Sequence, residues 1–116
     1  MDARQPLYRM KAEFFKTLGH PVRIRVLELL SRQDRAVSEM LPEVGIEPAA
    51  LSQQLAVLRR AGLVTSRREG LSVMYTLSSP EVAELLASAR RILTGVVSDQ
   101  AGWLDTAEPV STGAAG

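Results

Sequence analysis

The apolar residues of this chain change their spacing at Gly62. Before this glycine they recur every three or four positions, which is the period of helices with one buried face. After it, two β-prone stretches, residues 63–67 and 73–77, flank a polar segment that contains Gly70. The helical period then returns from Ser79 onward. The order of helices, hairpin and helix predicts a mainly α fold with one β-hairpin.

Glycine and proline residues mark the expected helix ends. Pro21 suits a first helical turn, and Gly62 lies where a C-terminal cap is expected. Ser38 either caps the third helix or lies in its first turn. A short connection containing Gly45 joins the third and fourth helices, which together form a helix-turn-helix candidate. The predicted helices span residues 7–18, 21–31, 37–44 and 48–61, and the last one begins at Ser79-Pro80-Glu81.

Length and composition limit the classes of protein. A chain of 116 residues that is 46% hydrophobic can bury one core, so we expect one domain over residues 1–104 and a flexible tail over 105–116. No apolar run is long enough for a membrane span or a signal peptide, and we therefore expect a soluble, cytoplasmic protein. The absence of cysteine excludes disulfides, thiolate metal sites and a cysteine nucleophile.

Basic residues concentrate in the first part of the chain. Residues 1–70 carry 12 Lys and Arg against 8 Asp and Glu, whereas the remainder carries 2 against 5. No acidic residue lies between Glu47 and Glu69, a stretch with four arginines. A local basic patch on a nearly neutral protein indicates a polyanionic partner. The four arginines are Arg59, Arg60, Arg67 and Arg68.

Three stretches also resemble a known family. They are residues 18–27 (LGHPVRIRVL), residues 51–64 (LSQQLAVLRRAGLV) and residues 67–70 (RREG) followed by Tyr75. Together they resemble the ArsR/SmtB family of bacterial transcription regulators, over about residues 7–97. The resemblance implies a winged helix-turn-helix with its fourth helix in the major groove of double-stranded DNA, and a homodimer formed by the first and last helices.

Several positions depart from the family pattern. Where many members bind metals through a Cys-x-Cys pair, this chain has Ala36 and Ser38. Between Ser78 and Trp103 the only acidic residues are Glu81, Glu84 and Asp99, and no histidine accompanies them. Because zinc sites favour clustered imidazoles and thiolates, we expect no metal and no cofactor. Gln54 replaces a frequent histidine, and Leu71 replaces a frequent basic residue after the glycine of the wing.

The fourth helix has the composition of a recognition helix, with small or short polar residues opposite an apolar stripe. Its Gln54 can pair bidentately with adenine. Arg67 and Arg68 are expected on the wing, where only one of the two contacts DNA strongly because neighbouring strand residues face opposite ways. The candidate DNA-binding residues are Pro48, Ala49, Ala50, Ser52, Gln53, Gln54, Arg59, Arg60, Arg67 and Arg68.

The first and last helices carry more apolar surface than a small monomer can bury, which indicates an interface between subunits. The aromatic residues Tyr8, Phe14, Phe15 and Trp103 belong either to the core or to this interface. The methionines fill gaps in the core or line a ligand pocket, and the sequence does not separate these two roles. The candidate interface residues are Leu7, Met10, Phe14, Leu85, Leu86, Ile92 and Leu93.

The only histidine, His20, precedes Pro21 and is expected to cap or pack at a helix junction. No catalytic motif is present, so we expect no enzyme. The sequence predicts a homodimeric repressor that binds an imperfect inverted repeat, with an unknown small-molecule effector left open. The alternatives are a winged-helix module that binds proteins, and a small-ligand-binding protein without affinity for DNA.

Overall fold

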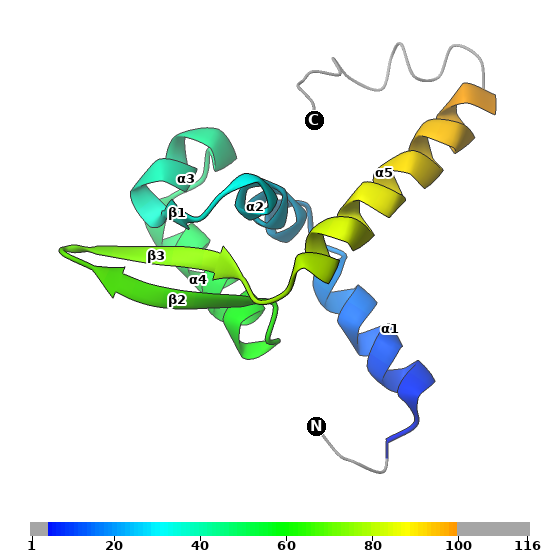
Figure 1. The fold of residues 1–116 in the computed structure, drawn as a ribbon, viewed down its shortest axis with the longest axis horizontal. Coiled ribbons are helices and arrows are strands. Elements are labelled where there is room, and N and C mark those ends of the chain that lie inside the picture. The colour runs from blue at the N-terminus through cyan, green and yellow to red at the C-terminus, as the bar shows by residue number, and fades with distance from the viewer. Residues whose placement is uncertain (1–4, 100–116) are drawn as a thin grey trace. The chain divides into compact units, whose positions relative to one another are not determined.

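The computed structural model describes residues 5–99, and it confirms the predicted mainly α fold with one β-hairpin (Figure 1). Trp103 and the expected tail, residues 105–116, lie outside the described residues. The chain divides into two compact units, one up to Ala83 and one from Glu84. In chain order the elements are α1 (Leu7–Leu18), α2 (Pro21–Arg32), β1 (Arg35–Ala36), α3 (Val37–Val44), α4 (Pro48–Arg60), β2 (Val64–Glu69), β3 (Ser72–Leu77) and α5 (Pro80–Asp99).

The junction between α1 and α2 follows the prediction made for His20. Its Nδ1 accepts a hydrogen bond from the backbone N–H of Val22 at 3.2 Å, so the imidazole caps the first turn of α2. Pro21 occupies the first helical position, where a missing N–H costs nothing. The expected capping role of His20 is confirmed.

Two glycines with positive φ set the helix-turn-helix. Gly45 ends α3 with φ 74°, and its N–H donates to the carbonyl of Leu41 at 2.9 Å. Gly62 follows α4 with φ 79°, and its N–H donates to the carbonyl of Arg59 at 3.0 Å. The next N–H, of Leu63, donates to the carbonyl of Leu58 at 3.0 Å, which completes a Schellman motif. This motif directs the chain from α4 into β2.

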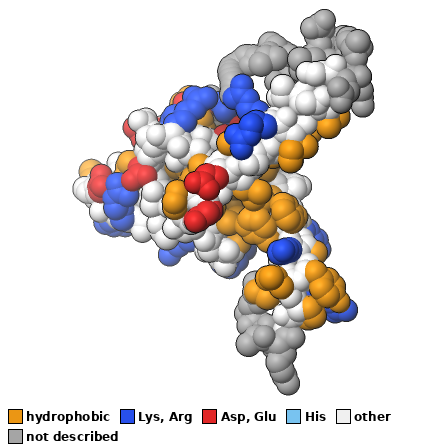
Figure 2. All heavy atoms as spheres, turned by 45° about the vertical axis from the view of Figure 1, so that its right-hand side comes forward, with side chains coloured by type: hydrophobic (Ala, Val, Ile, Leu, Met, Phe, Trp, Pro, Cys, Tyr) orange, Lys and Arg blue, Asp and Glu red, His pale blue; other side chains and the backbone are white. Residues whose placement is uncertain are grey.

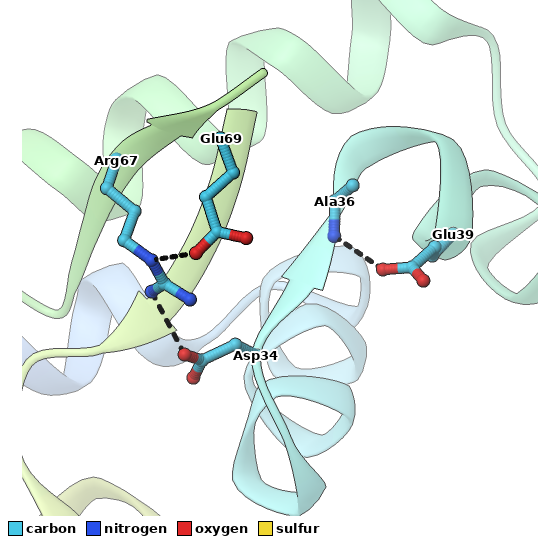
Figure 3. Close-up of polar contacts among 5 residues, drawn as sticks. All are labelled: Asp34, Ala36, Glu39, Arg67 and Glu69. Atoms are coloured by element: carbon cyan, nitrogen blue, oxygen red, sulfur yellow. Dashed lines mark hydrogen bonds and ion pairs between the residues drawn. The ribbon is translucent and has the colours of Figure 1, made fainter. Parts of the chain in front are cut away.

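The start of α3 resolves the role of Ser38. Ser38 lies in the first turn, and Ala36 occupies the N-cap position. A carboxylate oxygen of Glu39 accepts a hydrogen bond from the backbone N–H of Ala36 at 2.8 Å (Figure 3). This hydrogen bond links the first turn of α3 to Ala36, the last residue of β1.

The three strands form one antiparallel sheet in the order β1-β3-β2. The short strand β1 was not predicted, because two residues are too few to show a period of two. The expected five-residue turn is also wrong, since Arg68 pairs with Val73 and Glu69 pairs with Ser72. Only Gly70 and Leu71 remain in the loop, and Gly70 supplies the positive φ (64°) that such a tight turn needs.

The core of the first unit is built from aliphatic side chains of helices and the base of the hairpin. The apolar stripe of α4 is buried completely, as its spacing of three and four predicts. No helix among residues 5–99 is long and apolar enough to cross a bilayer. The largest fully buried side chains are Leu27, Leu29, Met40, Leu51, Leu55, Leu58, Val26 and Val64.

Candidate nucleic-acid interface

The solvent face of α4 combines short side chains with two terminal cations. Ala49, Gln53 and Arg60 are exposed and lie at spacings of four and seven, opposite the buried leucines. Pro48, Ser52 and Arg59 are also exposed. The exposed side chains Pro48, Ala49 and Ser52 of its first two turns are small, so the backbone of α4 can lie close to a polyanion. The two arginines at the end of the helix can contact the same polyanion.

Two other candidate residues of α4 are less accessible than the sequence predicts. Ala50 and Gln54 are half-buried, since both lie on the flank of the helix. The side-chain oxygen Oε1 of Gln54 accepts a hydrogen bond from Nε of Arg23 on α2 at 2.8 Å. A bidentate contact with adenine needs that same oxygen as an acceptor. In this structure the oxygen is already engaged, and no periodicity in the sequence indicates its partner.

The strand register separates Arg67 from Arg68. Because successive side chains alternate across a strand, Arg68 shares its sheet face with Ser66 and Val64. Val64 is buried, so this is the face that turns toward the helices. Arg67 lies on the opposite face with exposed Thr65. The expectation that the two arginines face opposite ways is confirmed.

Arg67 is held by two acidic residues (Figure 3). Its Nε donates to Oε2 of Glu69 at 2.7 Å, and its Nη1 donates to Oδ2 of Asp34 at 3.0 Å. The interpretation of Arg67 as an uncompensated cation is therefore wrong. Asp34 lies far away in the sequence, and only the pairing of β1 with β3 and of β3 with β2 brings it near.

These contacts shift the ionisation of the groups involved. The hydroxyl of Thr76 and then the guanidinium of Arg67 stabilise the carboxylate of Asp34, so its pKa lies below the usual value of 3.8. Glu69 and then Asp34 raise the pKa of Arg67 above its usual value. Both side chains stay charged at neutral pH, and Asp34, Arg67 and Glu69 together form a surface network that we call the wing latch.

The other three candidate arginines have no such partners. Arg59, Arg60 and Arg68 are exposed, and their guanidinium groups make no hydrogen bond or ion pair within the part of the chain that the structure describes. The first two end α4, where cations also complement the negative end of the helix dipole. The third extends from the adjoining strand β2 on its helix side. Of the four arginines singled out from the sequence, these three keep a charge that no acidic side chain neutralises within residues 5–99.

The candidate interface residues lie on α1 and α5, and each helix is considered by itself. On α1, Leu7 is 62% exposed, while Met10 and Phe14 are half-buried. On α5, Leu85 and Leu86 are half-buried, while Ile92 and Leu93 are 66% and 61% exposed. Figure 2 shows hydrophobic side chains at the surface of both helices. The exposed set also includes Tyr8, Phe15 and Val96.

Metal-ligating side chains do not gather anywhere in residues 5–99. No group of three or more His, Cys, Asp or Glu side chains in this part of the chain could hold an ion. The carboxylate of Glu81, one of the sparse acidic residues of α5, accepts a hydrogen bond from the hydroxyl of Ser79. That bond lowers the pKa of Glu81.

The amino-acid sequence of this chain is similar to those of known proteins. The pattern of the bacterial regulatory protein arsR family matches residues 20–66. The uncharacterized HTH-type transcriptional regulator Rv0081 of Mycobacterium tuberculosis is 56% identical over 87% of this chain and 90% of its own. A probable mercury resistance operon repressor of Streptomyces lividans is 33% identical over 81% of this chain and 72% of its own.

Solved structures agree with these sequence matches. The crystal structure of Rv0081 aligns with a TM-score of 0.77 at 58% identity, over 83% of this chain and 97% of that one. The homodimeric winged helix-turn-helix DNA-binding domain of Mb0332 from Mycobacterium bovis aligns with a TM-score of 0.64 at 32% identity, over 85% and 92% of the two chains. The chain therefore belongs to the ArsR/SmtB family of winged helix-turn-helix transcriptional regulators.

Proposed function

We propose that two copies of this chain bind an imperfect inverted repeat in double-stranded DNA and repress transcription by occluding a promoter in the cytoplasm. The observation that carries the proposal is the exposed face of α4, where Ala49 and Gln53 precede the unpaired Arg59 and Arg60. In this arrangement α4 enters the major groove, and Gln53 and Ser52 reach base edges. Arg68 contacts the phosphates beside the groove.

The apolar residues of α1 and α5 support the dimer in this proposal. Side chains such as Tyr8 and Ile92, which are 69% and 66% exposed, lose contact with water when a second copy covers them. Each Å² of apolar surface removed from water contributes about 25 cal/mol. A dimer axis between two recognition helices also explains why the expected DNA site is an inverted repeat.

A selection from genomic fragments tests this function. The purified protein is mixed with fragmented genomic DNA at physiological salt, and the bound fragments are sequenced and footprinted. We expect enrichment of an inverted repeat whose half-sites are about one helical turn, or roughly 10 base pairs, apart. Equal recovery of all fragments would contradict sequence-specific binding and would favour the protein-interaction module or the ligand-binding protein.

Two variants separate base reading from general affinity. Gln53→Ala should lower operator affinity by about 1–3 kcal/mol and leave affinity for random duplexes unchanged, because a base contact carries the sequence information. Glu47→Ala, at the exposed N-cap of α4 where no side-chain cap bond is made, is the matched control and should not reduce binding. The proposal includes no catalytic role, and an organic effector remains compatible with it.

A further inference from the structure

Arg23 on α2 connects the end of α1 to the recognition helix α4. Its Nε donates to Oε1 of Gln54 at 2.8 Å, and its Nη1 donates to the backbone carbonyl of Thr17 at 3.1 Å. Both bonds are partly buried, and both belong to the first compact unit. A single planar guanidinium therefore contacts two helices besides its own.

The bond to Thr17 gives Arg23 a fixed orientation. The last carbonyls of a helix have no partner within that helix, and a cation near them complements the negative end of the helix dipole. The neighbouring carbonyls of Lys16 and Leu18 accept from the N–H groups of Gly19 and His20. Arg23 thus satisfies the carbonyl that lies between these two and that the turn leaves open.

The bond to Gln54 acts on the rotation of α4 about its own axis. Gln54 lies on the flank of the helix, between the buried stripe of Leu51 and Leu55 and the exposed stripe that contains Gln53. Packing of the fully buried leucines determines which stripe of α4 faces the core. A charge-assisted bond on the flank is directional and adds a second restraint on the rotation of α4.

We propose that Arg23 is a positioning residue for DNA recognition: through Gln54 it sets the azimuth at which α4 presents Gln53 and Ser52 to the bases. Gln54 is therefore the residue of α4 that Arg23 holds, and its side chain does not itself contact a base. The inference rests on the function proposed above. The inference also couples α1 to α4. Arg23 is bonded to the carbonyl of Thr17, so a displacement of the end of α1 moves the guanidinium that holds Gln54.

Paired glutamine variants test the proposal. Gln54→Met and Gln53→Met are nearly isosteric changes on adjacent residues, one bonded to Arg23 and one exposed. We expect Gln54→Met to lower operator affinity by about tenfold, the scale of one hydrogen bond to a charged group, without changing which base pair is preferred at any position. Gln53→Met should abolish the preference at one position. Loss of the preference at one position in Gln54→Met would overturn the proposal.

A double-mutant cycle measures the coupling. Arg23→Lys cannot hold both acceptors in the geometry of a guanidinium, so it should also lower operator affinity about tenfold. If the two residues act as one unit, Arg23→Lys with Gln54→Met should again lose about tenfold. A loss of about a hundredfold would mean independent roles and would overturn the proposal. Gln54→Glu, which keeps an acceptor, should bind better than Gln54→Met at raised salt, where its added charge is screened.

A measurement without DNA separates failure of this inference from failure of the proposed function. Amide hydrogen exchange in α4 should be faster in both Arg23→Lys and Gln54→Met than in the wild type, while exchange in β2 stays unchanged. One outcome is that the wild type binds all duplexes equally while exchange in α4 is still faster in both variants than in the wild type. In that case the proposed function fails and the positioning role of Arg23 holds. Equal exchange rates in α4 for all three proteins would overturn the positioning role.

Discussion

Nη1 of Arg67 lies 3.0 Å from Oδ2 of Asp34, although the two residues are 33 positions apart in the chain. Asp34 precedes β1, Arg67 is in β2, and β3 runs between these two strands. The ion pair therefore spans the full width of the sheet. The ion pair thus links the hairpin to the segment between α2 and β1 of the same unit.

The wing latch should make the hairpin sensitive to acid. A carboxyl whose pKa is lower in the folded than in the unfolded state stabilises the fold above the unfolded value, and this stabilisation disappears as pH falls. For Asp34 the loss begins near its usual pKa of 3.8 and continues below it. We expect the protection factors of amides in β2 and β3, which are exchange rates corrected for the intrinsic pH dependence of exchange, to fall below about pH 4.

Asp34→Asn isolates this effect from other acidic groups. Glu43 and Glu81 also have lowered pKa values, through hydrogen bonds from Arg35 and Ser79, and they titrate in the same region. The variant should have lower protection factors at pH 7 and should show a smaller drop in protection between pH 5 and pH 3, a window set around the usual pKa of Asp34. Identical pH profiles for the variant and the wild type would contradict a role for the latch.

The two arginines of the wing should differ in their effect on DNA affinity. Arg68→Ala removes an unpaired cation, so it should weaken binding to all duplexes and reduce the slope of log K against log salt by about one. Arg67→Ala removes a cation that Asp34 and Glu69 already neutralise, and the slope should stay nearly the same. Titrations at several salt concentrations measure both slopes. A larger change of slope for Arg67→Ala would mean that DNA competes successfully with the latch.

The stability of the first unit should depend strongly on the buried stripe of α4. Leu55 has no exposed surface, so Leu55→Ala should lower the free energy of unfolding by about 2–5 kcal/mol. Leu71, at the tip of the hairpin, is 101% exposed and serves as the matched control. Leu71→Ala should change the free energy of unfolding by less than about 0.5 kcal/mol. Urea unfolding at pH 7 measures both changes.

The comparison of sequence and structure shows which features depend on local signals. Periodicity and caps predicted the bounds of α1 and α3 residue for residue, because glycine follows each helix directly. The wing latch and the bond between Arg23 and Gln54 were not predicted. The Arg67–Asp34 and Arg23–Gln54 bonds join residues 33 and 31 positions apart, and such contacts arise from strand register and helix packing. Charge counts along the chain therefore overstated the positive charge available at Arg67.

The exposed apolar residues of α5 should hold two copies of the chain together. Ile92→Asp with Leu93→Asp places two charges on this surface, and burial of charges without partners is too costly for an interface to persist. We expect the variant to have the mass of one chain in solution at micromolar concentration and the wild type to have the mass of two. Leu71→Asp, which changes a still more exposed leucine on the hairpin, should remain dimeric. A monomeric wild type would refute the dimer.

Operator binding should not depend on a transition metal. The sequence has no cysteine, and its only histidine, His20, uses Nδ1 to accept the N–H of Val22. Tight sites for zinc, nickel or cadmium need thiolates or several imidazoles, and a dimer would offer only two copies of His20.

Treatment with a strong chelator should therefore leave operator affinity within about twofold, a change of roughly 0.4 kcal/mol, in fluorescence titrations. Addition of micromolar zinc should have as little effect, and Glu81→Gln with Glu84→Gln should behave as the wild type does. A shift in affinity of tenfold or more that the chelator reverses, and that these two substitutions abolish, would reveal an oxygen-rich site formed with Asp99. In that case the sparse carboxylates of α5 would be ligands, and the regulator would respond to metal after all.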